Sequence, residues 1–176
     1  RAALLAREDA LLTHPSEICQ SASAAYAAAI ATGVAGGDAS AMWQAAHANA
    51  GSGAASDVIR SRLEEAHRGP PDDYQSQMGW VLTAFHNAFH WLRNCANLEH
   101  AVISTVSAGG DTDTNAAVCG ALLGAIQGRD AVPLQWRNAV LTCRPVHASD
   151  IKHPRPMGYW PDDALDLAEA LLAAAT

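Results

Sequence analysis

The sequence predicts an all-α protein, a compact orthogonal bundle of helices. Alanine dominates the composition and β-branched residues are sparse, which favours helix over strand. Apolar residues recur at helical spacing, most clearly over residues 80–93, where they form one stripe. No stretch alternates apolar and polar residues strongly enough to indicate a strand.

Glycine and proline breaks predict the individual helices. In the first half, helices are expected over residues 1–11, from Pro15 to Thr32, over residues 39–49, and between Gly53 and Gly69. In the second half, they are expected over residues 80–93, over residues 97–106, from an acidic motif to Gly128, from Pro133, and from Pro161. Residues 143–159 contain three prolines and should form an irregular surface loop. In the last helix, four residues are expected to face inward: Leu165, Ala168, Leu171 and Leu172.

Length and charge narrow the function classes. A chain of 176 residues makes one domain or part of one. The net charge of −7 leaves no basic stripe for a phosphate backbone, which argues against a nucleic-acid partner. No apolar run approaches the roughly 20 residues that cross a bilayer, and Arg7-Glu8-Asp9 interrupts the apolar start too early for a signal peptide. We therefore expect a cytoplasmic protein without a membrane partner.

The four cysteines of the chain should be reduced and mostly buried: Cys19, Cys95, Cys119 and Cys143.

The most informative stretch is Gly109-Gly110-Asp111-Thr112-Asp113-Thr114-Asn115, which enters a small, apolar helix. The two glycines allow a sharp turn and a close approach of the backbone to a ligand. The helix N-terminus that follows favours ionised carboxylates. Carboxylate and hydroxyl oxygens from Asp111, Asp113 and Thr114 are the ligands that a hard cation such as Mg²⁺ or Ca²⁺ prefers.

Three other kinds of motif share some of these residues. Asp and Thr before a helix are commonly N-caps, and a capping role can coexist with metal binding. An EF-hand loop that starts at Asp111 needs glycine at its sixth position and glutamate at its twelfth, but the chain has Ala116 and Leu122 there. An aspartyl-phosphate loop would use Asp111 as its nucleophile, but Asn115 departs from that pattern.

Residues 109–116, with Ala121-Leu122-Leu123-Gly124-Ala125 after them, closely resemble the C-terminal signature of the ADP-ribosylglycohydrolases. This family includes the dinitrogenase-reductase-activating glycohydrolase and the jellyfish J1 crystallins. The resemblance implies the same all-α bundle, and a site in which Asp111, Asp113 and Thr114 bind Mg²⁺, with two ions in the complete site. It also implies that ADP-ribose, or an ADP-ribosylated protein, is the partner.

The family's N-terminal half contributes a Gly-Asp-Ala-Leu-Gly loop, a Thr-Asp-Asp-Thr segment and a catalytic carboxylate. Neither segment occurs in residues 1–176. We therefore expect the whole chain, residues 1–176, to be the C-terminal part of a single domain, with the N-terminal portion of the same protein as a missing partner. The catalytic residue itself is unknown from this sequence.

Two further places resemble ligand-binding parts of the family. Leu12-Thr13-His14-Pro15 resembles a Thr-His-Pro turn beside the bound ADP-ribose, so His14 is a candidate ligand contact. Gly79-Trp80 resembles a Gly-aromatic loop that lines the ribose side of the cleft, and an indole face can stack on a base or cover a ribose face. The alternatives are a surface histidine at position 14, and a turn with a core tryptophan at residues 79–80.

His86 and His90 stand four residues apart on one expected helix, a spacing that can hold Zn²⁺. However, Asn87 replaces the glutamate of a His-Glu-x-x-His protease, and no third ligand is evident. We therefore expect an ordinary helix flank. The pairs Asp72-Asp73 and Asp162-Asp163 are expected to be loop and cap charges.

The sequence leads to one main hypothesis for function. An Mg²⁺-dependent glycoside hydrolase would remove ADP-ribose from a modified protein or a related conjugate. The alternative is a non-catalytic member of the same family that binds ADP-ribose, acts as an immunity protein, or is structural like the crystallins.

Overall fold

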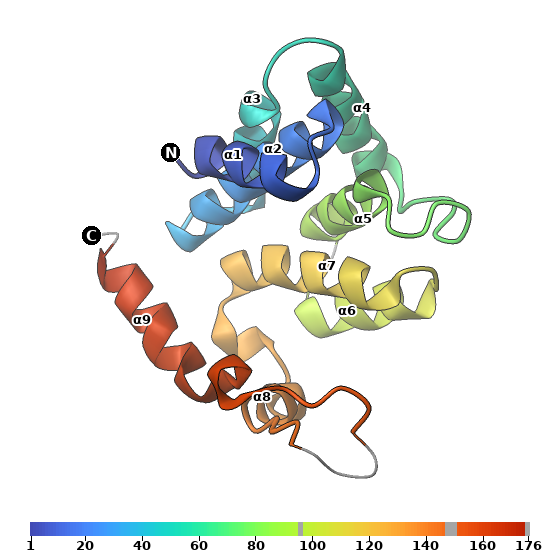
Figure 1. Cartoon of the computed structure of the whole chain (residues 1–176). Helices are drawn as coiled ribbons and strands as arrows, with labels where there is room; N and C mark the ends of the chain where they lie inside the picture. The colour runs from blue at the N-terminus through green and yellow to red at the C-terminus, as the bar shows by residue number, and fades with distance from the viewer. Residues whose placement is uncertain (95–96, 147–150, 175–176) are drawn as a thin grey trace. The chain divides into compact units, whose positions relative to one another are not determined.

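The computed structural model describes residues 1–94, 97–146 and 151–174, and the regular elements among them are all helices (Figure 1). The predicted all-α class is therefore confirmed. The chain divides into two compact units, residues 1–131 and residues 132–176. Each unit is described by itself.

In the described residues of the first unit there are seven α-helices and one short 3₁₀ helix. These are α1 (Ala2–Thr13), α2 (Glu17–Val34), α3 (Ala39–Asn49), α4 (Ala54–Arg68), α5 (Val81–Asn94), α6 (Leu98–Ser107), α7 (Thr112–Gln127) and η1 (Arg129–Ala131). Their order follows the predicted breaks. Gly33, expected to stop the second helix, instead lies buried within the last turn of α2.

Small residues let the helices of this unit approach one another closely. Ala25 and Ala29 of α2 are fully buried, and α2 packs against α1, α3 and α7. At Gly33, a Cβ would lie 2.9 Å from Sδ of Met42 in α3 and 3.2 Å from the carbonyl carbon of Ala125 in α7. A larger residue there would push the helices apart.

Helix α7 packs against α5 and α6 as well as α2 (Figure 1). Leu122 of α7 and Phe89 of α5 are fully buried in this core. The hydroxyl of Tyr26 in α2 donates a 2.8 Å hydrogen bond to the carbonyl of Val118. The helix that begins with the acidic motif is thus held by packing on several neighbours.

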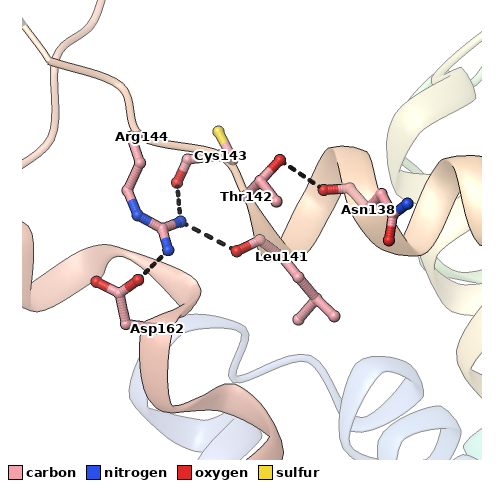
Figure 2. Close-up of polar contacts among 6 residues, drawn as sticks. All are labelled: Asn138, Leu141, Thr142, Cys143, Arg144 and Asp162. Carbon is pink, nitrogen blue, oxygen red and sulfur yellow. Dashed lines mark hydrogen bonds and ion pairs between the residues drawn. The ribbon is translucent and has the colours of Figure 1, made fainter.

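The second unit contains α8 (Leu134–Leu141), η2 (Met157–Tyr159), η3 (Pro161–Asp163) and α9 (Ala164–Ala174). Figure 2 shows how Arg144 joins its parts: the guanidinium donates to the carbonyls of Leu141 and Cys143, at 3.0 and 2.8 Å, and pairs with Asp162. Asp162, expected only as a cap charge, is therefore an ion-pair partner.

The prediction that the apolar face of the last helix points inward is wrong. Leu165, Leu171 and Leu172 of α9 are 40%, 64% and 55% exposed, and Ala168 is exposed too. Helical periodicity identifies which residues share a face, but it does not show whether another element covers that face.

The cysteine prediction holds for two of its four positions. Cys19 and Cys119 are buried, whereas Cys143 is exposed beside Arg144. Cys95 lies outside the described residues. Among the helices that the structure describes, none is long and apolar enough to cross a membrane.

Candidate functional site

The acidic turn, residues 109–114, connects α6 to α7. Gly109 and Gly110 have φ values of 81° and 71°, in the left-handed region that residues with a Cβ rarely adopt. A Cβ on Gly110 would lie 1.9 Å from the carbonyl oxygen of Tyr74. Glycine is therefore required at position 110 for two reasons, the backbone conformation and the contact with the loop of residues 69–80.

The two carboxyl groups of the turn interact with each other. Asp111 is the N-cap residue of α7, yet its side chain makes no capping hydrogen bond to the helix. A hydrogen bond with the Asp111 carboxyl group, assisted by the backbone amides of Thr114 and Asp113, holds the pKa of Asp113 below its usual range. Two acidic groups this close together repel when both are ionised unless a proton or a cation lies between them.

Exposure differs along the turn. Asp111 is half-buried, whereas Asp113 and Thr114 are exposed in the first turn of α7. Within the described part of the chain, no arginine or lysine pairs with either carboxylate. The turn therefore presents oxygen atoms without a protein cation to neutralise them.

This donor set fits a hard divalent cation such as Mg²⁺ in its chemistry. Two carboxylates and a hydroxyl supply about three of the six oxygens that Mg²⁺ prefers. No group of three or more His, Cys, Asp or Glu side chains placed to hold a metal occurs among the described residues. The described residues would thus supply part of a coordination sphere, which water, substrate or another part of the protein would have to complete.

Gly79 lies next to the acidic turn. Its φ is 76°, and a Cβ built on it would be 3.7 Å from Oδ2 of Asp111. The structure thus brings together two places that the sequence analysis singled out separately. Because Gly79 has no side chain, it leaves the approach to the Asp111 carboxylate open on this side.

Trp80 follows directly and precedes α5. Its side chain is half-buried, and with residues 77–79 it lines a shallow cavity of about 460 Å³. It also lines a larger cavity of about 620 Å³ that extends along the loop to Arg62, Arg68 and His86. Trp80 therefore lines both cavities, and in the smaller one it is next to Gly79, which neighbours the acidic turn.

His14 is exposed in the connection between α1 and α2, and its Nδ1 lies 2.8 Å from the hydroxyl of Thr13. The hydrogen bonds found within the described residues do not link it to the acidic turn. Its predicted ligand contact stays a prediction.

His86 and His90 bind the end of α4. Nε2 of His86 lies 2.8 Å from the carbonyl oxygen of Gly69, and Nδ1 of His90 lies 3.1 Å from that of Ala66. Burial lowers the pKa of His86, so its neutral form, with Nε2 as the donor, is favoured. Both histidines thus satisfy orphan carbonyls at a helix C-terminus, as expected of a helix flank.

Asp73 also has a local role. Its carboxylate accepts hydrogen bonds from the backbone amides of Gln75 and Ser76, at 2.7 and 3.1 Å, and these bonds lower its pKa. The expectation of a loop charge at Asp73 is confirmed.

Sequence reasoning missed a buried polar cluster behind the acidic turn. Asn87 of α5 is fully buried, and its Oδ1 accepts hydrogen bonds from the Tyr74 hydroxyl at 2.8 Å and the Trp91 indole at 3.1 Å. Its Nδ2 donates to the hydroxyl of Thr105 in α6 at 3.0 Å. Burial raises the pKa of Tyr74 to about 12, so the hydroxyl stays a donor at neutral pH. The available signal was an asparagine inside the apolar stripe of an amphipathic helix.

Comparisons with known proteins point to one family. The family model described as ADP-ribosylglycohydrolase matches residues 1–175. A protein of Acanthamoeba polyphaga mimivirus, provisionally named an ADP-ribosyl glycohydrolase, is 38% identical over 69 residues, which make up 39% of this chain and 21% of that protein. No solved structure matches the chain at the significance required. Because the family model extends over nearly the whole sequence, the chain belongs to the ADP-ribosylglycohydrolase family.

Proposed function

We propose that the protein containing this chain is an Mg²⁺-dependent hydrolase that cleaves the glycosidic bond between ADP-ribose and a modified side chain or a related conjugate. The main support is the acidic turn itself, where the Asp111 carboxylate lies beside Gly79 and no arginine or lysine of the described residues pairs with Asp111 or Asp113. Membership of the family, and the name of its mimivirus relative, support the choice of ADP-ribose as the substrate class.

In this mechanism, Asp111, Asp113 and Thr114 would hold the ion, which would supply Lewis-acid stabilisation at the ribose when bound. Because Gly79 has no side chain, the side of the Asp111 carboxylate next to it stays open for the sugar. The half-buried indole of Trp80 offers an apolar face to the substrate. Fixing the sugar in this way lowers the entropic part of the barrier. A carboxylate outside the described residues would activate the attacking water.

The experiment measures the release of ADP-ribose by the full-length protein from arginine-linked and serine-linked ADP-ribosylated proteins, with Mg²⁺ or with EDTA. We expect EDTA to abolish turnover. Asp111→Asn and Asp113→Asn should each reduce it at least about 100-fold, because second-shell losses already cost about 10- to 100-fold and these are direct ligands. Asp38→Asn is the matched control, since Asp38 also follows two glycines and precedes a helix.

Near-normal turnover by Asp111→Asn would refute the proposal. Binding of ADP-ribose in calorimetry without any product would support the non-catalytic alternative instead. Those two measurements separate a hydrolase from a binding protein of the same family.

A further inference from the structure

A buried hydrogen-bond cluster ties three elements together behind the acidic turn. Asn87 belongs to α5, Thr105 to α6, and Tyr74 to the loop of residues 69–80. Asn87 and Thr105 are fully buried, and Tyr74 is 9% exposed. Because these groups have no access to bulk water, each bond that is lost leaves an unsatisfied polar atom in the core.

The cluster has little freedom to rearrange. The amide oxygen of Asn87 faces the Tyr74 hydroxyl, the Trp91 indole and, at 3.3 Å, the Thr105 hydroxyl, while its nitrogen donates to that Thr105 hydroxyl. A flipped amide would place its N–H donors against the Trp91 indole, which can only donate. The Tyr74 side chain is therefore held in one position.

Tyr74 then touches the acidic turn through its backbone. The contact is close enough that a Cβ on Gly110 would be 1.9 Å from the Tyr74 carbonyl oxygen and 2.8 Å from its carbonyl carbon. Gly110 directly precedes Asp111. In addition, Thr105 lies in the last turn of α6, from which the acidic turn emerges. The cluster therefore restrains the acidic turn in two ways, through the loop that contains Tyr74 and through α6, which precedes the turn.

We propose that Tyr74, held by Asn87, is a positioning residue that fixes the Gly110 backbone and so places the Asp111 carboxylate to bind a divalent cation together with Asp113. This inference rests on the proposed function, because it assumes that the acidic turn binds metal. Tyr74 acts through the backbone of Gly110 and does not itself ligate the ion.

The test compares two Tyr→Phe variants of the full-length protein. Tyr74→Phe removes the hydrogen bond to Asn87. Tyr26→Phe removes a bond of the same length, 2.8 Å, to the backbone of α7, but one that does not reach the loop. Mg²⁺ and Mn²⁺ affinities are measured by calorimetry, and thermal unfolding is followed in EDTA.

We expect both variants to lose similar stability without metal. Only Tyr74→Phe should weaken cation binding, by about 5- to 10-fold, at or just below the range typical of residues that orient metal ligands. The control should stay within about twofold of the wild type. If Tyr74→Phe does not fold, Thr105→Val tests the same cluster and should weaken binding in the same direction.

Equal cation affinities for the two Tyr→Phe variants would overturn the positioning role while leaving the proposed metal site intact. If the wild type binds no divalent cation, and Asp111→Asn changes nothing, both the positioning role and the proposed function are overturned. The two failures are therefore distinguishable in one set of titrations.

Discussion

Two helices of the first unit are preceded by the same three residues, yet the two aspartates differ in their hydrogen bonds. Residues 36–38 and residues 109–111 are both Gly-Gly-Asp, and they precede α3 and α7. Asp38 caps α3 through a 2.8 Å hydrogen bond from the amide of Ala41. Asp111 makes no such bond, and its carboxyl group meets Asp113 instead.

The difference lies in the backbone and in what the glycines contact. Asp38 has ψ of 176°, an extended conformation suited to capping, whereas Asp111 has ψ of 71°. Gly37 approaches Thr32 and Ala41, both near it in the sequence, but Gly110 packs against Tyr74 from a distant loop. A local turn therefore leaves the aspartate free to cap its helix, whereas a tertiary contact directs Asp111 elsewhere.

The largest expected effect follows from Gly110→Ala, compared with Gly36→Ala. Both glycines have positive φ, but a Cβ at Gly36 would meet nothing within 4 Å. Gly36→Ala should therefore cost only the left-handed strain, about 1–2 kcal/mol of unfolding free energy. Gly110→Ala adds a backbone clash and should cost about 3–5 kcal/mol. Urea denaturation measures both values, and equal losses would contradict the close contact with Tyr74.

A smaller effect on stability is expected when Asp38 and Asp111 are each replaced by alanine. In EDTA, Asp38→Ala should lose about 1 kcal/mol of stability because a helix cap is removed. Asp111→Ala should stay within about 0.5 kcal/mol of the wild type because Asp111 makes no cap bond and its neighbour Asp113 is exposed to solvent. Added Mg²⁺ should raise the melting temperature of Asp38→Ala but not that of Asp111→Ala. A melting temperature that Mg²⁺ raises equally in both variants would contradict the separation of roles.

The smallest effect concerns pH. The folded protein lowers the pKa of Asp113, so the stability that this group contributes is fully present above the usual Asp pKa of about 3.9 and is lost as the pH falls through the lower, folded value. We therefore expect Asp113→Asn to show a shallower decline in unfolding free energy below pH 4 than the wild type. The measurement is urea denaturation in EDTA from pH 6 to pH 3. If the unfolding free energies of the two proteins fall in parallel with pH, the proposed interaction between Asp113 and Asp111 is contradicted.

Much of the fold was predictable because its signals are local. Proline and glycine mark helix ends wherever they occur, so the breaks near Pro15, Gly69 and Gly128 matched the observed elements. The exposed leucines of α9 were not predictable in the same way. Their spacing is helical, but coverage of a helix face depends on residues far away in the sequence.

In the candidate site, too, the residues adjacent in the sequence were predictable and their distant partners were not. Asp111, Asp113 and Thr114 were identified because they are adjacent in the sequence and match a long motif. The partners of this turn were not identified, since Tyr74 and Asn87 have no sequence spacing that relates them to it. From the sequence, Asn87 is notable only because it replaces the glutamate of a zinc-protease motif, although it is the centre of the buried cluster.

The sequence by itself determined which segments are helical and where the acidic oxygens lie along the chain, because both depend on neighbouring residues. Only the tertiary structure decided which Gly-Gly-Asp caps its helix and which turns its carboxylate toward a second one. The physical reason is that the contact of Tyr74 with Gly110 sets a backbone conformation that the three residues alone leave open.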